Sequence, residues 1–253
     1  MHYYTHKAGT NHIDLAECQT RGIRVINTPG GTADAVSEHA LALYFATRRK
    51  IVAMHGAVAD RDENGENLWK RETSAVSKMR MANSQPPNSL NQEIVGIFGY
   101  GFIGKRLENL CRALVHRADR LPFDEVVESA SVLFITCPHT CETINMIDEP
   151  EFAAMRSDAI VINVSRGGVV NENSLVGALQ AGKISGAGVD VFDIEPASSP
   201  ADSVLLSEYS RDLNLVFSPH AAYFSAQTIL NMQNKMREHL ENWIAGNKID
   251  FVV

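Results

Sequence analysis

Short apolar runs alternate with amphipathic stretches over most of the chain after residue 93. Runs of β-branched and aromatic residues are typical of buried parallel strands, whereas apolar positions three and four residues apart are typical of helices that cover a sheet. This pattern predicts strands at 24–26, 94–98, 132–137, 159–164, 188–192 and 213–217. It predicts helices at 13–20, 32–49, 105–114, 123–130, 148–155, 171–181 and 225–245. The alternation favours an α/β fold with a doubly wound parallel sheet and right-handed crossovers.

Two regions depart from this alternation. Residues 58–92 are polar and rich in Asn, Ser and charge, so we expect a long connection at a domain joint. Trp69 is the large apolar side chain of this stretch, and we expect it to be a packing anchor. The long helix at 225–245 carries an apolar stripe, which we expect to be core or a subunit contact. The stripe consists of Ile229, Met232, Met236, Leu240 and Trp243.

A glycine-rich turn joins the predicted strand at 94–98 to the helix that follows it. In this setting Gly99 permits a tight turn, Gly101 lets the backbone approach a pyrophosphate, and Gly104 lets helix and strand pack closely. The free N–H groups and the dipole of the helix N-terminus attract phosphate. The motif therefore predicts a dinucleotide-binding site, against the alternative of an ordinary strand–helix turn. The expected cofactor-binding residues of the turn are Gly99, Gly101, Phe102, Ile103 and Gly104.

The segment after the glycine-turn helix is too short to hold comfortably the second strand that completes a dinucleotide site. Only residues 114–122 remain for a second strand, its turn and a connection. In dinucleotide sites an acid about 20 residues past the glycines usually binds the ribose. Asp119 and Asp124 are candidates, but Asp124 is also explained by a helix dipole, and we favour a site without an acid ligand. Arg117 or Arg120 could instead bind a 2′-phosphate, which would favour NADP.

The composition and net charge indicate which kinds of protein this chain can be. The 253 residues are 45% hydrophobic and 21% charged, as expected for one large globular domain or two smaller ones. A net charge of −7 argues against a nucleic-acid binder, and we see no apolar run long enough to span a membrane. The four cysteines are too few for a disulfide scaffold, so we expect a cytoplasmic protein. Cys137 and Cys141 flank His139, but without a second ligand pair we expect no metal site.

Three polar residues follow predicted strands: Arg166, Glu195 and His220. Singly, each has an ordinary explanation as a solvated surface charge, a loop acid or a structural histidine. Ligands of parallel sheets, however, bind at the carboxyl ends of the strands. There an arginine offers a planar fork to a carboxylate, and a histidine can donate or accept a proton near neutral pH. A carboxylate beside the imidazole stabilises its protonated form, so together the three supply what the reduction of a 2-oxo acid needs.

The sequence resembles the D-isomer-specific 2-hydroxyacid dehydrogenase family. The matching stretches are AGTNHIDLAECQTRGIRVINTPGGTADAVSEHALAL, GIFGYGFIGK, NVSRGGVVNENSLVGAL, GAGVDVFDIEP and SPHAA, which cover nearly all of the chain in order. The resemblance implies that Arg166 grips the substrate carboxylate and polarises the carbonyl. It implies that His220 is the acid/base and that Glu195 orients and tunes it.

The resemblance also implies the remaining contacts of the site. Asp190 would reach the nicotinamide carboxamide, and Pro138 and Val164 would line the cofactor pocket. Ala8 and Gly9 would offer backbone N–H groups to the substrate carboxylate.

The implied fold is a Rossmann-type NAD-binding domain plus a remnant of a flavodoxin-like substrate domain. We assign residues 1–30 to the remnant and residues 31–224 to the dinucleotide-binding domain, with the helix at 32–49 crossing between the two. Residues 225–253 would form a helix and tail that return toward the substrate domain. Relative to the family pattern, the chain lacks most of the flavodoxin-like half before the AGTNHID motif and a stretch near 114–122. The missing inner strand would leave two sheet edges unpaired unless its neighbours close up.

The implied function is that of a homodimeric, NAD-dependent oxidoreductase, with NADP as the other possible cofactor. It would interconvert a small 2-oxo acid, such as glyoxylate or hydroxypyruvate, and its D-2-hydroxy acid, such as glycerate, by hydride transfer. The two departures motivate an alternative: a non-catalytic or inactive truncated relative that binds nucleotide or a protein partner. The complete set of Arg166, Glu195 and His220 argues against that alternative.

Overall fold

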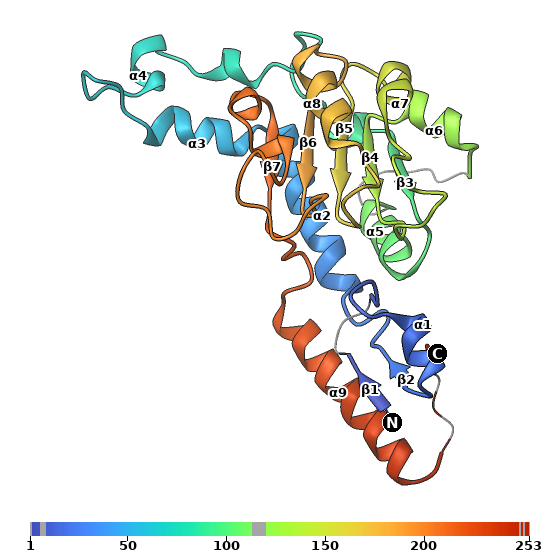
Figure 1. The fold of residues 1–253 in the computed structure, drawn as a ribbon. Helices are drawn as coiled ribbons and strands as arrows, with labels where there is room; N and C mark the ends of the chain where they lie inside the picture. Colours follow the sequence, from blue (N-terminus) through green and yellow to red (C-terminus); the bar gives the residue numbers. More distant parts are fainter. Residues whose placement is uncertain (1, 6–8, 113–119, 248, 250, 253) are drawn as a thin grey trace. The chain divides into compact units, whose positions relative to one another are not determined.

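The computed structural model describes residues 2–5, 9–112, 120–247, 249 and 251–252, and the chain divides into two compact units (Figure 1). The first unit joins Met1–Val36 to Tyr223–Val253. The second unit is Ser37–Ala222 and holds most of the secondary structure. No helix in the described part of the chain is long and apolar enough to cross a membrane.

The second unit is built on a parallel sheet. Its strand order among the described residues is β3-β4-β5-β6-β7, and every neighbouring pair runs parallel. The strands are β3 (Val95–Phe98), β4 (Val132–Ile135), β5 (Ile160–Asn163), β6 (Gly186–Val189) and β7 (Leu215–Phe217). The α/β parallel architecture predicted from the sequence is therefore confirmed.

Helices cover both faces of this sheet (Figure 1). On one face, α6 (Phe123–Ser129), α7 (Glu149–Ala154) and α8 (Glu172–Gln180) bury one apolar cluster against the strands. On the other face lie α2 (Ala33–Arg48) and α5 (Phe102–Arg112). All five helices match predicted helices to within a few residues, because their apolar positions repeat with the helical period.

Strand β6 begins two residues earlier and ends three residues earlier than predicted, and close packing surrounds its two glycines, Gly186 and Gly188. A Cβ atom on Gly186 would lie 2.6 Å from Thr47 Cγ2, and one on Gly188 would lie 2.9 Å from Leu43 Cβ. The same Cβ atoms would also lie 2.3 Å from Asn214 Nδ2 and 2.9 Å from Ile162 Cδ1, respectively, so both glycines fit a place where α2 and the neighbouring strands approach closely. Glycine weakens an isolated strand, so the sequence pattern counted against a strand that begins at Gly186.

Strand β3 pairs directly with β4. Their register places Val95 opposite Val132 and Phe98 opposite Ile135. Within the described residues, β3 and β4 are therefore direct neighbours, and no inner edge of the sheet is left unpaired between them. Residues 113–119, which contain most of the segment expected to hold a second strand, lie outside the described residues.

Helix α3 (Ile51–Ala59) precedes the stretch expected to be a long connection and extends into its first two residues. The stretch itself contains the short helices α4 (Leu68–Glu72), η1 (Val76–Met79) and η2 (Leu90–Gln92). Two more, η3 (Val204–Leu206) and η4 (Glu208–Ser210), precede β7. Trp69 lies on α4 and is 55% exposed, so its assignment as a packing anchor was wrong. The physical reason is that none of the five residues of α4 is buried, so this helix presents no side chain to the core.

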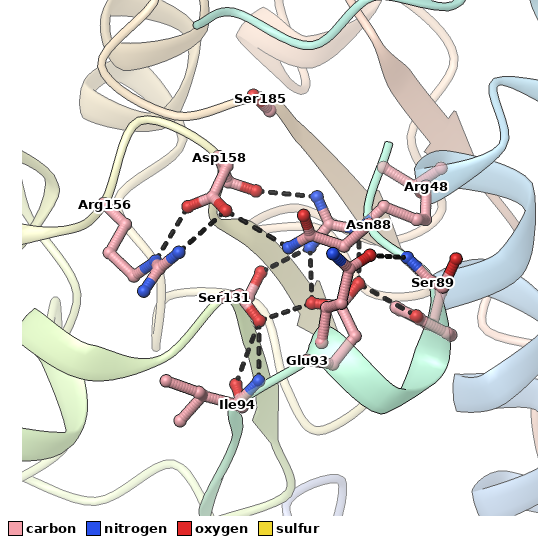
Figure 2. A network of polar contacts seen from close by, with 12 residues as sticks. Arg48, Asn88, Ser89, Glu93, Ile94, Ser131, Arg156, Asp158 and Ser185 are labelled. Atoms are coloured by element: carbon pink, nitrogen blue, oxygen red, sulfur yellow. Dashed lines mark hydrogen bonds and ion pairs between the residues drawn. The ribbon is translucent and has the colours of Figure 1, made fainter. Parts of the chain in front are cut away.

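A buried polar network lies at the amino-terminal ends of β3, β4 and β5 (Figure 2). Arg48, 1% exposed, lies with its Nε 2.7 Å from Glu93 Oε1. Its Nη1 and Nη2 donate to the carbonyls of Asp158 and Ser131, each at 2.7 Å. Tyr44 donates to Glu93 at 3.0 Å, and burial, followed by the Glu93 charge, raises the pKa of this phenol. The network joins α2 to the sheet at the end opposite the strand termini where ligands bind.

Among the described residues, the first unit contains a two-stranded parallel sheet, two complete helices and the first turn of α2. Strand β1 (His2–Tyr4) pairs with β2 (Arg24–Ile26), and α1 (Leu15–Thr20) lies between them in sequence. Helix α9 (Ala226–Ile244) matches the helix predicted at 225–245 to within one residue at each end, and Ser225 caps it. Its apolar stripe is largely open: Ile229, Met236, Leu240 and Trp243 are 37, 39, 46 and 53% exposed. Within the described residues the stripe is therefore not core, and the subunit contact stays a prediction.

Candidate active site

The glycine turn has the features that a pyrophosphate needs. Gly99 has φ +94°, and a Cβ there would lie 2.4 Å from the Cys137 nitrogen. A Cβ on Gly104 would lie 2.0 Å from the Gly99 oxygen, so these two glycines are required by the turn and its packing. A Cβ on Gly101, by contrast, would meet no atom within 4 Å in the described part of the chain. Packing within the described residues therefore does not explain Gly101, and its role beside a pyrophosphate stays a prediction.

The turn is fixed from both sides. The Thr136 hydroxyl, at the end of β4, donates to the Gly99 oxygen at 2.7 Å, and the Ser37 hydroxyl lies 3.3 Å from the Ile103 oxygen. Phe102 is 66% exposed at the first position of α5, where the helix N–H groups are free to bind an anion. The structure therefore places the predicted turn residues at a helix N-terminus with an open approach.

The other predicted cofactor contacts differ in accessibility. Pro138 is exposed and lies three residues past the end of β4. Val164 follows β5 and is only 5% exposed, and its N–H donates to the Ile135 oxygen at 3.3 Å. Both residues thus lie past the carboxyl ends of neighbouring strands, but the Val164 side chain faces the protein interior.

The region expected to bind the ribose is partly described. Asp124 lies in the first turn of α6, as the dipole argument predicted, whereas Asp119 and Arg117 lie outside the described residues. The Arg120 guanidinium lies 4.9 Å from the centre of the Tyr100 ring, beside the glycine turn. The Tyr100 hydroxyl donates to Glu108, which raises the pKa of Tyr100 and lowers the pKa of Glu108.

Arg166 lies in a loop that Asn163 organises at the end of β5. The Asn163 Oδ1 accepts from the Ser165 N–H at 3.1 Å, and its Nδ2 donates to the Arg166 oxygen at 3.0 Å. The Arg166 Nη1 donates to the Ser165 oxygen at 2.6 Å, and the residue is half-buried. These bonds fix the backbone that carries the guanidinium at the carboxyl end of the sheet.

Glu195 and His220 are in direct contact. The His220 Nδ1 lies 2.6 Å from Glu195 Oε2, and the two side chains are 39% and 33% exposed. The other carboxylate oxygen of Glu195 accepts from the Phe192 N–H at 3.0 Å, which holds the carboxylate in place. Because Nδ1 is engaged, Nε2 is the nitrogen that can exchange a proton with a substrate.

Asp190 anchors the loop that carries His220. It is 1% exposed, and its Oδ1 accepts from the Ser218 hydroxyl at 2.6 Å and the Ala221 N–H at 3.0 Å. Its Oδ2 accepts from the Ala222 N–H at 3.0 Å, and its backbone oxygen accepts from the His220 N–H at 2.7 Å. His220 has φ +50°, a left-handed conformation that a non-glycine residue keeps only when its surroundings impose it. The predicted contact of Asp190 with a nicotinamide stays a prediction beside this observed role.

His39 is a site residue that the sequence reasoning missed. Its Nε2 lies 2.7 Å from the Ser218 hydroxyl and 3.6 Å from Asp190 Oδ1. Helix α2 thereby reaches the loop of His220. The sequence feature that could have indicated this role is a polar residue between Val36 and Leu43, on the buried face of a helix.

Four other residues entered the sequence predictions: Ala8, Gly9, Cys137 and Cys141. Gly9 is half-buried and belongs to the first unit, while Ala8 lies outside the described residues, so their role as carboxylate ligands stays a prediction. Cys137 is buried, which raises the pKa of its thiol, and Cys141 is exposed. The described residues contain no group of three His, Cys, Asp or Glu side chains that could hold a metal ion.

The sequence of this chain is similar to those of known proteins. A family model described as D-isomer specific 2-hydroxyacid dehydrogenase, NAD binding domain, matches residues 41–222. The glycerate dehydrogenase of Methylorubrum extorquens is 33% identical over 248 residues, which cover 94% of this chain and 74% of that protein. The D-3-phosphoglycerate dehydrogenase of Archaeoglobus fulgidus is 31% identical over 94% of this chain, and the chain spans only 44% of its length.

The fold of this chain is also similar to that of a solved structure. It is an NADPH-dependent glyoxylate/hydroxypyruvate reductase from Sinorhizobium meliloti, in complex with NADP and malonate. It has a TM-score of 0.77 and 28% sequence identity, and the match covers 100% of this chain and 77% of that chain.

Proposed function

The chain belongs to the D-isomer-specific 2-hydroxyacid dehydrogenase family and carries its NAD-binding domain, and from this premise we propose that it interconverts a small 2-oxo acid and its D-2-hydroxy acid. The observation that carries the proposal is the Glu195–His220 pair, joined at 2.6 Å. The pair lies in the same unit as the glycine turn and Arg166.

The glycine turn supports the binding of a nicotinamide dinucleotide. Residues 99–104 and the N-terminus of α5 would hold its pyrophosphate, since Gly101 leaves the space that a phosphate needs. When bound, the cofactor supplies the hydride for reduction or accepts it in oxidation. Arg120, beside Tyr100, is the described side chain that could bind a 2′-phosphate and favour NADP.

The chain's own residues supply the rest of the reaction. Arg166 binds the substrate carboxylate with its planar guanidinium and polarises the adjacent carbonyl. As the carbonyl carbon gains a hydride, the protonated His220 transfers its Nε2 proton to the carbonyl oxygen, which yields the hydroxyl group. Glu195 holds Nδ1 and stabilises the charged imidazolium. In the oxidative direction His220 removes the hydroxyl proton.

We propose glyoxylate or hydroxypyruvate as the oxo acid, because relatives named glyoxylate reductase and glycerate dehydrogenase are 31% and 33% identical to this chain. We further propose that residues 1–30 are the remnant of a substrate-binding domain, that residues 31–224 bind the dinucleotide, and that residues 225–253 return toward the remnant. In this arrangement Gly9 would help to bind the carboxylate. The homodimer and the cytoplasmic location remain predictions.

The test is to incubate the full chain with NADH or NADPH and glyoxylate, hydroxypyruvate or pyruvate, and to follow loss of the reduced nicotinamide absorbance. We expect turnover with at least one pair, and its loss in His220→Gln. Fluorescence titration with NADH runs in parallel. Tight NADH binding by a folded chain that turns over none of these acids would contradict the dehydrogenase proposal and support a nucleotide-binding relative instead.

A further inference from the structure

The loop that carries Glu195 is packed directly on the loop that carries Arg166. A Cβ atom on Gly167 would lie 1.9 Å from the Phe192 oxygen, so the two backbones touch where Gly167 lacks a side chain. Next to this contact, Asp193 Oδ1 accepts from the Gly168 N–H at 2.7 Å. The positions of the two loops are therefore coupled through residues adjacent to the proposed reacting groups.

A second carboxylate, from Glu172, holds this junction from the protein interior. Glu172 is the first residue of α8 and is 6% exposed. Its Oε1 accepts from the Asp193 N–H at 2.9 Å, and its Oε2 accepts from the Ser203 hydroxyl at 2.5 Å. Burial raises the pKa of Glu172, and the nearby Asp193 charge raises it further, while the two hydrogen bonds lower it.

Helix capping does not account for Glu172. The cap of α8 is Asn171, whose side chain accepts from the Ser174 N–H. A solvated acid in the first turn stabilises a helix through the helix dipole. Glu172, however, lies among apolar side chains, where burying an ion costs free energy unless it is hydrogen-bonded. The side chains around it include Val161, Leu175, Val189 and Leu205. Both of its oxygens are directed at loop donors rather than at its own helix.

We propose that Glu172 is a positioning residue that, through Asp193, sets the Glu195–His220 pair relative to Arg166. The inference rests on the proposed function, in which Arg166 and His220 act on adjacent groups of one small substrate. A displacement of about 1 Å between such groups costs about 10²-fold in rate. Asp193 lies two residues before Glu195, and the Phe192 N–H bonds to Glu195, so a shift at Asp193 is transmitted to the carboxylate that holds His220.

The test compares two substitutions of Glu172. Glu172→Ala leaves the Asp193 N–H without its acceptor, and we expect kcat for the oxo acid to fall about 10–100-fold while the affinity for NADH stays the same. In Glu172→Gln the amide oxygen can accept from Asp193 while the amide nitrogen donates to the Ser203 hydroxyl, so we expect near-normal kcat. The matched control is Ser131→Ala, which removes a buried hydroxyl at the opposite end of the sheet and should lower stability without lowering kcat.

Amide hydrogen exchange provides a readout that needs no turnover. We expect Glu172→Ala, but not Glu172→Gln or Ser131→Ala, to accelerate exchange across residues 165–168 and 191–196. Normal kcat in Glu172→Ala, unchanged exchange in these segments, or an equal loss of kcat in Glu172→Gln would each overturn the inference. If the wild-type chain has no turnover, the proposed function fails by itself. The exchange comparison then decides whether Glu172 fixes the two loops.

Discussion

The substitution Asp190→Asn tests whether the His220 loop is held by a buried charge. Asparagine has the shape of aspartate, but one carboxylate oxygen becomes an NH₂ group, which cannot accept a hydrogen bond. Asp190 accepts three donors through its side chain: the Ser218 hydroxyl and the Ala221 N–H on Oδ1, and the Ala222 N–H on Oδ2. In the better orientation of the amide, the oxygen keeps the two Oδ1 bonds and the NH₂ group faces the Ala222 N–H.

The expected cost follows from that geometry. A hydrogen bond to a charged group contributes about 1.5–3 kcal/mol, and Ala222 would also be left as a buried donor without an acceptor. Because Asp190 is 1% exposed, water cannot replace the lost bond. We therefore expect Asp190→Asn to lower the free energy of unfolding by about 2–4 kcal/mol. The left-handed backbone of His220 depends on the same anchor, so we also expect kcat to fall.

Urea denaturation of wild type and variant measures the stability, and steady-state kinetics measures kcat. The control is Ser218→Ala, which removes one donor but leaves both backbone bonds to the Asp190 carboxylate. It should cost about 1.5–3 kcal/mol, the contribution of one bond to a charged group, without leaving a buried backbone donor unpaired, and it should keep kcat near normal. A variant Asp190→Asn with normal stability would refute the anchoring argument. If such a variant also bound NADH weakly, Asp190 would act on the cofactor and not on the loop.

Four further predictions concern single side chains. His220→Gln should lower kcat by about 10²–10⁴-fold with unchanged NADH affinity, and a near-normal kcat would contradict the acid/base role. Arg166→Lys should mainly raise KM for the oxo acid, because lysine has no bidentate fork; an unchanged KM would contradict carboxylate binding. Arg48→Met should lower the free energy of unfolding by about 3–5 kcal/mol, measured in urea, since it leaves a buried carboxylate unpaired; a neutral result would contradict that pairing. The Arg156 guanidinium lowers the pKa of Asp158, so the stabilisation is present above the ordinary value of 3.8 and is lost as pH falls through the lower folded value. Asp158→Asn should remove that acid-dependent loss, which pH-dependent thermal denaturation would show.

Local patterns predicted most of the sheet and its covering helices. The run at 94–98 and the helix at 171–181 appear as β3 and as α8 with its Asn171 cap, because alternation, helical periodicity and capping act over a few residues. The sequence-based predictions failed where contacts between distant elements determine the structure. Trp69 is apolar, yet its helix presents no side chain to the core, and Gly186 is a poor strand residue that fits the close packing around it.

The sequence by itself determined which groups are candidates for the chemistry: the glycine turn, Arg166, Glu195 and His220 follow strand ends and match a family pattern. Only the tertiary structure decided how these groups are held. Asp190 accepts from residues about 30 positions later, and Glu172 accepts from Asp193 and Ser203. Such pairs are set by the register of β5, β6 and β7, which brings distant loops together. No periodicity along the chain encodes that register for an individual hydrogen bond, because it results from the packing of the whole sheet.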